Sequence, residues 1–169
     1  MFDPGEGRQK NSEFLSRAVH RVVGPAMGAI TLAHDLALRI DHLTYNDCTS
    51  AFVEKIKDPV TGQKKMVFNR TNIKVGETIL LCEDVLTTGG SVEMAENTVV
   101  SAGGTVMPYV LVLVNRSGLT EVNGKKIIAL INSPMLTWDA EDCPLCKLGS
   151  EAILPKTPAE NWVRLNARY

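Results

Sequence analysis

Residues 78–104 constrain the fold of this chain more than any other stretch. The segment reads TILLCEDVLTTGGSVEMAENTVVSAGG. It opens with a short continuous apolar run, 78–82, of the kind that forms a strand buried on both faces. Two acids and a loop of small residues follow, and then an apolar stripe at helical spacing that stops at Gly103 and Gly104. The segment therefore predicts a strand, a tight loop and a helix over 92–102.

The rest of the chain repeats this alternation of strands and helices. Further helices are predicted at 11–20 and 29–40, and further strands at 21–23, 51–53, 66–68, 109–114 and 126–131. We expect the last two strands to be buried, residues 41–51 to be turn-like, and residues 55–65 to form a mobile loop or a hairpin turn. Such alternation predicts an α/β fold with an open, mostly parallel, twisted sheet flanked by helices. We expect a single domain over 1–169, with a core at about 12–135 and a C-terminal tail at 136–169.

Composition excludes several classes of protein. The 169 residues carry 18 basic and 19 acidic side chains, for a formal charge of −1, and 44% are hydrophobic. A disordered chain would be less apolar and more charged, and a dedicated nucleic-acid binder would be more basic. No apolar run approaches the ~18 residues of a membrane span, and the polar start of the chain is unlike a secretory signal. Four unevenly placed cysteines favour a reduced, cytoplasmic setting.

The acidic pair and the loop after it indicate the kind of ligand. A Thr/Gly/Ser loop that leads into a helix presents backbone N–H groups and the positive end of the helix dipole, which suits a phosphate. Neither GxxxxGK[ST] nor GxGxxG is present. Glu83 and Asp84 would repel the phosphate unless they face vicinal ribose hydroxyls or a divalent cation. The segment therefore predicts a ligand with a 5′-phosphate and a free 2′,3′-diol.

The sequence ILLCEDVLTTGGS (79–91) closely resembles the phosphoribosyl-pyrophosphate (PRPP) motif of type I phosphoribosyltransferases. RVVGPAMGAITLAHDLA (21–37) resembles the pyrophosphate loop and helix of the same family. The resemblance implies the family's Rossmann-like fold. It implies PRPP contacts from Glu83, Asp84, Val85, Leu86, Thr87, Thr88, Gly89, Gly90 and Ser91. It implies pyrophosphate contacts from Gly24, Pro25, Ala26, Met27, Gly28 and Lys55.

Other stretches resemble orotate phosphoribosyltransferases in particular. AFVEKI (51–56) with KMVFNRTNIKVGE (65–77) is similar to a shorter-loop subgroup, and DCPLCKLG (142–149) is similar to its tail. LVNRSG (113–118) resembles a strand end at which the family's arginine contacts the pyrimidine, although Asn115 replaces the usual acid. The resemblance, over about 12–150, implies that Thr87 and Arg116 bind orotate and that the product is orotidine 5′-phosphate, in pyrimidine nucleotide synthesis.

The chemistry that this resemblance implies needs no covalent enzyme nucleophile. The C1′–O bond to pyrophosphate breaks as a ring nitrogen approaches from the other face, so the enzyme must fix the ribose, neutralise the leaving group and exclude water. Lys55 and Asp84 are the expected catalytic residues, with Lys57, Lys64 and Lys65 as alternates for Lys55. We expect Mg²⁺ to arrive on PRPP rather than at a protein metal site. In the family the 55–65 loop serves the neighbouring subunit, which implies a homodimer.

Two alternatives remain open at this point. One is a phosphoribosyltransferase for a purine or another base, which would share the PRPP motif but need not depend on Arg116. The other is a PRPP-binding regulatory protein without catalysis. Orotate enzymes normally carry an N-terminal hood over the base, and only about ten residues precede the first helix expected here. Four alternatives stay open for those contacts: residues 1–12, the C-terminus or another chain supplies them, or they are missing.

Several conspicuous residues are interpreted without a catalytic role. The three histidines are spaced for neither a metal nor a relay and are expected to be structural or exposed: His20, His34 and His42. Cys143 and Cys146 form one CxxC, whereas a zinc site normally needs four ligands. A redox role is disfavoured because no helix N-terminus clearly follows. Aromatic residues near the C-terminus are expected to be packing anchors: Trp138, Trp162 and Tyr169. Residues 155–169 receive no functional interpretation.

Overall fold

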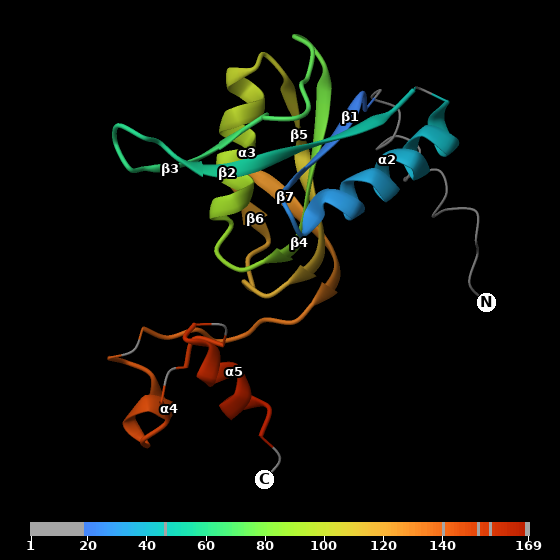
Figure 1. Ribbon diagram of the computed structural model, residues 1–169. Helices are drawn as coiled ribbons and strands as arrows, with labels where there is room; N and C mark the ends of the chain where they lie inside the picture. The colour runs from blue at the N-terminus through green and yellow to red at the C-terminus, as the bar shows by residue number, and fades with distance from the viewer. Residues whose placement is uncertain (1–18, 46, 140, 152, 156, 168–169) are drawn as a thin grey trace, which may run out of the picture. The chain divides into compact units, whose positions relative to one another are not determined.

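The computed structural model describes residues 19–45, 47–139, 141–151, 153–155 and 157–167 (Figure 1). The chain divides into two compact units, Met1–Pro134 and Met135–Tyr169. The division lies next to the expected boundary between core and tail at 135–136. The expected helix over 11–20 falls almost wholly outside the described residues.

A seven-stranded sheet forms the first unit. Its elements are β1 (Arg21–Pro25), α2 (Ala29–Thr44), β2 (Thr49–Lys57), β3 (Lys64–Val67), β4 (Thr78–Leu86), α3 (Gly90–Ser101), β5 (Thr105–Asn115), β6 (Glu121–Val122) and β7 (Lys125–Asn132). The strand order is β3-β2-β1-β4-β5-β7-β6. The five inner strands are parallel, and the two edge strands, β3 and β6, are antiparallel to their neighbours. The predicted mostly parallel α/β sheet is confirmed.

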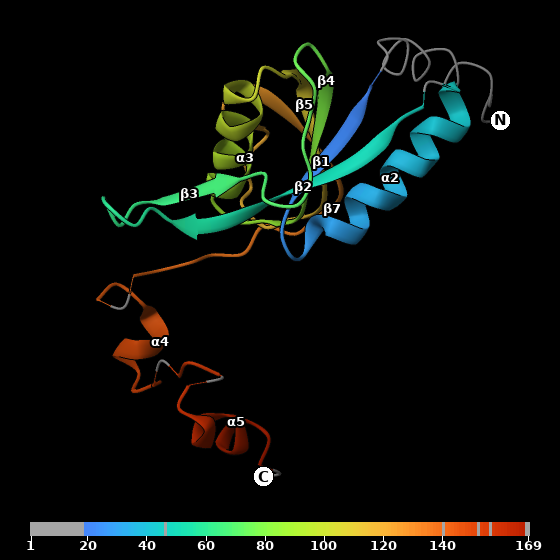
Figure 2. The ribbon, with the colours of Figure 1, turned by 45° about the horizontal axis from the view of Figure 1, so that its top comes forward.

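The two long helices cover opposite faces of the sheet (Figures 1 and 2). Helix α2 packs Ala29, Ala33 and Ala37 against one face, where small side chains let the helix approach the strands closely. Helix α3 packs Val92 and Val99 against the other face. Successive strand residues point to opposite faces, so β4 supplies both cores in turn. The continuous apolar run at 78–82 is therefore part of a strand buried on both sides, as predicted.

Some predicted boundaries were wrong. Helix α2 continues to Thr44 and ends at Tyr45 in the left-handed conformation, so residues 41–44 are helical rather than turn-like. Strands β5 and β7 were expected to be buried, but β7 alternates and Leu130 on its outer face is 77% exposed. Strand β6 was not predicted at all. It pairs with β7 through a turn at Asn123 and Gly124, both of which have positive φ, so a local turn and not an apolar run defines it.

The segment 55–65 is a hairpin whose arms were misjudged. Strand β2 runs on to Lys57 and β3 begins at Lys64, so the lysines lie on paired strands rather than in a loop. Only the residues between them form the turn. Asp58 organises that turn, because its Oδ1 accepts hydrogen bonds from the backbone N–H groups of Val60 and Thr61 at 3.0 Å.

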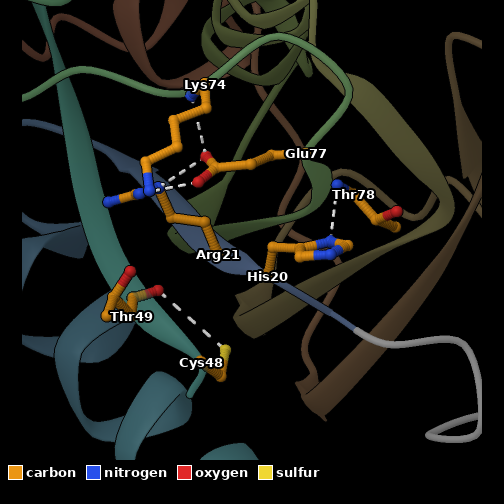
Figure 3. A network of polar contacts seen from close by, with 7 residues as sticks. All are labelled: His20, Arg21, Cys48, Thr49, Lys74, Glu77 and Thr78. Atoms are coloured by element: carbon orange, nitrogen blue, oxygen red, sulfur yellow. Dashed lines mark hydrogen bonds and ion pairs between the residues drawn. The ribbon is translucent and has the colours of Figure 1, made fainter. Parts of the chain in front are cut away.

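The amino ends of β1 and β4 are joined by a polar network (Figure 3). The Arg21 guanidinium donates two hydrogen bonds of 2.9 Å to the Glu77 carboxylate, which also accepts the backbone N–H of Lys74 at 3.0 Å. His20 Nδ1 accepts the backbone N–H of Thr78 at 3.0 Å. His20 is thus structural, as expected, and His34 and His42 are exposed on α2.

In its described residues the second unit contains two short helices, α4 (Pro144–Lys147) and α5 (Ala159–Leu165). Trp138 is 47% and Trp162 55% exposed, so the expectation that they anchor a packed core is wrong for these two residues. Tyr169 lies outside the described residues. Across the described part of the chain, the helices are too short or too polar to span a membrane.

Candidate active site

The predicted binding segments meet at one edge of the sheet. Parallel pairing aligns Pro25 of β1 with Val53 of β2, and Leu86 of β4 with Asn115 of β5. The chain segments that leave these strands therefore lie at the same edge. In open α/β sheets, ligands bind at this carboxyl edge. Topology thus brings together three stretches that are far apart in the sequence: 24–28, 83–91 and 115–116.

The loop between β4 and α3 forms a small polar cradle. Gly89 has a φ of 85°, a left-handed conformation that favours glycine, and it directly precedes the first residue of α3. The first N–H groups of a helix have no partner within the helix, so those of α3 are free to bind an anion here. A cavity of about 30 Å³ lies in the cradle. Its lining contains eight of the nine predicted PRPP residues: Glu83, Val85, Leu86, Thr87, Thr88, Gly89, Gly90 and Ser91.

The hairpin of β6 and β7 packs against this cradle and supports it. A Cβ atom on Gly89 would lie 2.5 Å from Val122 Cγ2, so the loop and β6 are in close contact. Glu96 of α3 pairs with Lys125 Nζ, and its other oxygen accepts a hydrogen bond of 2.5 Å from Asn123 Nδ2. The hairpin is thereby fixed to the helix whose N-terminus forms the cradle. Sequence reasoning missed this support because Glu96 and Lys125 are 29 residues apart.

The acidic pair occupies the end of β4 rather than the loop after it. Glu83 is only 6% exposed, and its pKa is raised to about 8, chiefly by burial and then by a hydrogen bond to Asp84 and the charge of that residue. Asp84 is only partly buried, and its carboxylate lies next to Gly28 in the loop that follows β1. A Cβ atom on Gly28 would overlap the Asp84 carboxylate, so a side chain at position 28 would force that carboxylate to move.

The predicted pyrophosphate loop, 24–28, therefore touches the acidic pair directly. A Cβ atom on Gly24 would lie 2.7 Å from the carbonyl oxygen of Ala29 and 3.1 Å from Cys82 Sγ, so the loop packs tightly where it enters α2. The backbone N–H of Ala26 donates to the Val53 carbonyl at 2.8 Å, which ties the loop to β2. The Ala26–Met27 peptide bond is cis, and the Met27 side chain is exposed.

Lys55 is the hairpin lysine whose charge acts on the acidic pair. It is exposed on β2, and its positive charge partly offsets the raised pKa of Glu83. Lys65 pairs with Asp58 at 2.7 Å, and Lys57 lies opposite Lys64 in the hairpin register. Among the four candidate lysines, Lys55 is therefore favoured, because its charge acts on the Glu83 carboxyl.

Arg116 and Asn115 complete the edge. The backbone N–H of Arg116 donates to the Leu86 carbonyl at 2.9 Å, which holds Arg116 beside Thr87. Arg116 Nε is buried and finds no hydrogen-bond partner among the described residues. A buried donor without a partner is costly and is expected to be satisfied when a ligand binds.

Asn115 has a positioning role that sequence reasoning missed. It is 3% exposed, and its Nδ2 donates to the Leu119 carbonyl at 2.8 Å and to Asn132 Oδ1 at 3.2 Å. Its Oδ1 accepts from the backbone N–H of Ser117 at 3.0 Å and from the Ser117 hydroxyl at 2.6 Å. An aspartate could accept both bonds but donate neither. The signal was present in NRSG, since asparagine before a turn often bonds to the backbone two residues on.

The edge has the chemistry of an anion and diol site. It combines free helix N–H groups, glycines that allow close approach, one buried acid beside another, a lysine and an unsatisfied arginine. In the described part of the chain, no three His, Cys, Asp or Glu side chains are grouped to hold a metal ion.

Comparison with known proteins gives a consistent result. Residues 8–138 match the model of the phosphoribosyl transferase domain family. An orotate phosphoribosyltransferase of Heliobacterium modesticaldum is 37% identical over 134 residues, which are 79% of this chain and 64% of that protein. One of Acidithiobacillus ferrooxidans is 34% identical over 83% of this chain and 67% of its own. The chain thus spans about two thirds of the length of these relatives.

Solved structures share the fold at lower identity. An adenine phosphoribosyltransferase of Rhodothermus marinus aligns with a TM-score of 0.55 and 21% identity, over 77% of this chain and 81% of that one. An orotate phosphoribosyltransferase of Aeropyrum pernix aligns with a TM-score of 0.51 and 22% identity, over 74% and 72% of the two chains. At this identity the likeness concerns the fold of the sheet and its helices.

Proposed function

The chain belongs to the phosphoribosyltransferase family, and from this premise we propose that it transfers the phosphoribosyl group of PRPP to orotate, with orotidine 5′-phosphate and pyrophosphate as products. The observation that carries the proposal is the sheet edge at which the acidic pair, the cradle before α3 and the unsatisfied Arg116 meet. The relatives that match over most of this chain and are named orotate phosphoribosyltransferases support orotate as the base.

The proposed contacts follow from the chemistry of each group. The N–H groups at the start of α3, with Thr88 and Ser91, bind the 5′-phosphate. Glu83 and Asp84 bind the ribose diol. With a pKa of about 8, Glu83 is largely protonated at neutral pH, so the pair offers a donor as well as acceptors to two neighbouring hydroxyls. The backbone of 24–28 binds the pyrophosphate. Thr87 and the Arg116 guanidinium bind orotate, whose carboxylate suits a charge-assisted hydrogen bond.

The proposed reaction is a displacement at C1′. A ring N–H of orotate loses its proton to solvent as the nitrogen donates its electron pair to C1′, and the C1′–O bond breaks with its electron pair leaving on pyrophosphate. Lys55 neutralises the charge that builds up on the leaving group, while Asp84 fixes the ribose so that C1′ faces the base. No covalent intermediate with the protein is required.

Mg²⁺, the homodimer and the cytoplasmic setting complete the proposal. Mg²⁺ usually keeps water and phosphate oxygens as ligands, so it would enter with PRPP rather than bind first to protein side chains. Bound to PRPP, it offsets the negative charge of the pyrophosphate. The 55–65 hairpin acts over the site of a second copy. Four free cysteines, two of them buried, support a reduced compartment.

A turnover assay tests the proposed reaction. Purified protein, Mg²⁺, PRPP and orotate are mixed, and the loss of orotate absorbance is followed, with hypoxanthine, adenine and uracil in parallel. Turnover of orotate alone supports the proposal. If only a purine is turned over, that purine and not orotate is the substrate. PRPP binding without turnover of any base makes the chain a PRPP-binding protein without catalysis.

Mixing two inactive variants tests the shared site. Lys55→Ala keeps Asp84, and Asp84→Asn keeps Lys55. If Lys55 serves the site of the partner copy, a mixed dimer contains one complete site and activity returns after subunit exchange. If Lys55 serves the Glu83 of its own chain, whose pKa it lowers in the structure, no mixed dimer has a complete site and the mixture stays inactive.

A further inference from the structure

The second unit contains a pair of thiols that the proposed reaction does not use. Cys143 directly precedes α4, and the backbone N–H of Cys146 donates a hydrogen bond of 3.4 Å to Cys143 Sγ. Both side chains are half-buried, so solvent reaches them. A redox role is disfavoured by the sequence alone, in which no helix N-terminus clearly follows the cysteine pair. That reason was wrong, since one helical turn begins directly after Cys143 and brings Cys146 back to it.

We propose that Cys143 and Cys146 are a reversible dithiol–disulfide site that reacts with small-molecule disulfides. A disulfide needs Cα atoms roughly 4.4–6.8 Å apart, and a step of three residues in a helical turn lies in that range. The Cys143 sulfur already faces the backbone of Cys146. The bond can therefore close with little movement of the chain.

The two thiols differ in the way that such a reaction requires. The hydrogen bonds from the backbone and thiol of Cys146 lower the pKa of Cys143, and the Cys143 sulfur in turn raises the pKa of Cys146. Because the thiolate is the nucleophile, Cys143 attacks first and Cys146 resolves. The other two cysteines are the opposite case. They are buried, and burial raises the pKa of Cys48 to about 11 and that of Cys82 to about 12.

The reaction balances in two exchange steps. The Cys143 thiolate attacks one sulfur of the small disulfide, whose S–S bond breaks, so one half leaves as a thiolate and the other stays bonded to Cys143. Cys146 then loses its proton to solvent and attacks the Cys143 sulfur, and the second half leaves as a thiolate. The two protein sulfurs are oxidised, the small disulfide is reduced to two thiols, and the electron pair passes between them.

Oxidised glutathione is the probe. The full chain, reduced and then freed of reductant, is incubated with it at neutral pH, and peptide mapping by mass spectrometry follows each cysteine. We expect a disulfide between Cys143 and Cys146 within one chain, which dithiothreitol reverses. With iodoacetamide instead, Cys143 should react at least about tenfold faster than Cys48 or Cys82, in line with the larger thiolate fraction.

Variants separate the two roles. Cys146→Ser keeps a hydroxyl and the backbone N–H that bonds to Cys143, so a stable mixed disulfide with glutathione should accumulate on Cys143. Cys143→Ser should form no intramolecular disulfide. Cys48→Ser and Cys82→Ser are the controls and should behave like the unchanged chain. The proposal is overturned if the unchanged chain also stops at the mixed disulfide, if the bond joins two chains, or if the reduced protein holds zinc on these thiols.

Discussion

Charged side chains are paired at one end of strands β1 and β4, and at the other end they have no ion-pair partner among the described residues. At the amino ends of β1 and β4, the mostly buried charges of Arg21 and Glu77 face each other and bond twice (Figure 3). At the carboxyl ends, Glu83 is buried beside a second acid, and Arg116 Nε has no partner among the described residues. The same sheet thus carries one satisfied end and one unsatisfied end.

This difference separates stability from function. A fully bonded polar network rigidifies the fold, whereas partly satisfied groups cost free energy until something binds them. Proteins keep such costs mainly at sites where a ligand offsets them. Substitutions at the amino edge should therefore reduce stability and leave catalysis intact, and substitutions at the carboxyl edge should do the reverse.

The largest effect is expected for Asp84→Asn. The change keeps the shape of the side chain but removes the charge that we propose orders the ribose diol at the transition state. We expect kcat/KM for PRPP to fall by about 10²–10³-fold, the range for losing one well-placed transition-state interaction. The free energy of unfolding should change little. Asp35→Asn, on the exposed side of α2, is the matched control. Unchanged kinetics for Asp84→Asn would move the ribose elsewhere.

Arg116→Ala comes next in size. It removes the proposed partner of the orotate carboxylate, so we expect kcat/KM for orotate to fall about 100-fold, as for a lost charge-assisted hydrogen bond in a dry site. Stability should stay constant or rise slightly, because a buried donor without a partner is removed. Arg39→Ala, on exposed α2 surface, should leave both quantities unchanged. Steady-state kinetics and urea unfolding give the two readouts, and a loss of stability at full activity would contradict the assignment.

Arg21→Ala should give the reversed pattern. Arg21 and Glu77 are mostly buried, so removing the guanidinium leaves the carboxylate without its main partner. We expect a loss of about 2 kcal/mol in the free energy of unfolding, with kcat/KM of the folded protein unchanged. In a double-mutant cycle, Glu77→Ala should add little to Arg21→Ala, because both remove the same interaction. A loss of activity larger than the loss of folded protein would mean that the two edges are coupled.

Local pattern in the sequence was sufficient for the elements that form the cradle. The apolar run of β4, the acidic pair and the stripe of α3 lie within one continuous stretch, so strand, loop and helix follow from nearest neighbours. The same holds for the predicted pyrophosphate loop, because Gly24 and Gly28 lie where the structure brings other atoms close to the backbone.

Long-range packing accounts for what the sequence did not predict. The two-residue strand β6 has no periodicity to detect, yet Val122 lies against Gly89 and fixes the cradle. The polar pattern of the 55–65 segment suggested a loop, but cross-strand pairing extended both arms. The β7 segment is apolar in sequence, which suggests burial. Whether a helix covers Leu130 depends on distant parts of the chain, and among the described residues none does.

The smallest effect is a pH dependence whose sign differs between the two edges. Arg21 holds the pKa of Glu77 below its ordinary 4.5, so the stabilising contribution of Glu77 is present above that pH and is lost as the pH falls. Glu83 behaves in the opposite way. Its pKa rises from 4.5 to about 8 on folding, so the stability linked to its protonated form is complete below about 4.5 and is lost as the pH rises through 8.

Two glutamine variants isolate these slopes in the protein without PRPP. Glu83→Gln should remove the loss of stability between about pH 4.5 and pH 8. Near pH 9 its free energy of unfolding should exceed that of the unchanged chain by about 1–2 kcal/mol. Glu77→Gln should keep that loss, and its stability should instead fall less steeply as the pH drops below about 4.5. Urea unfolding from about pH 4 to pH 9 measures both. Parallel curves for Glu83→Gln and the unchanged chain would mean that Glu83 is already ionised at neutral pH, and the pair would then offer the diol acceptors only.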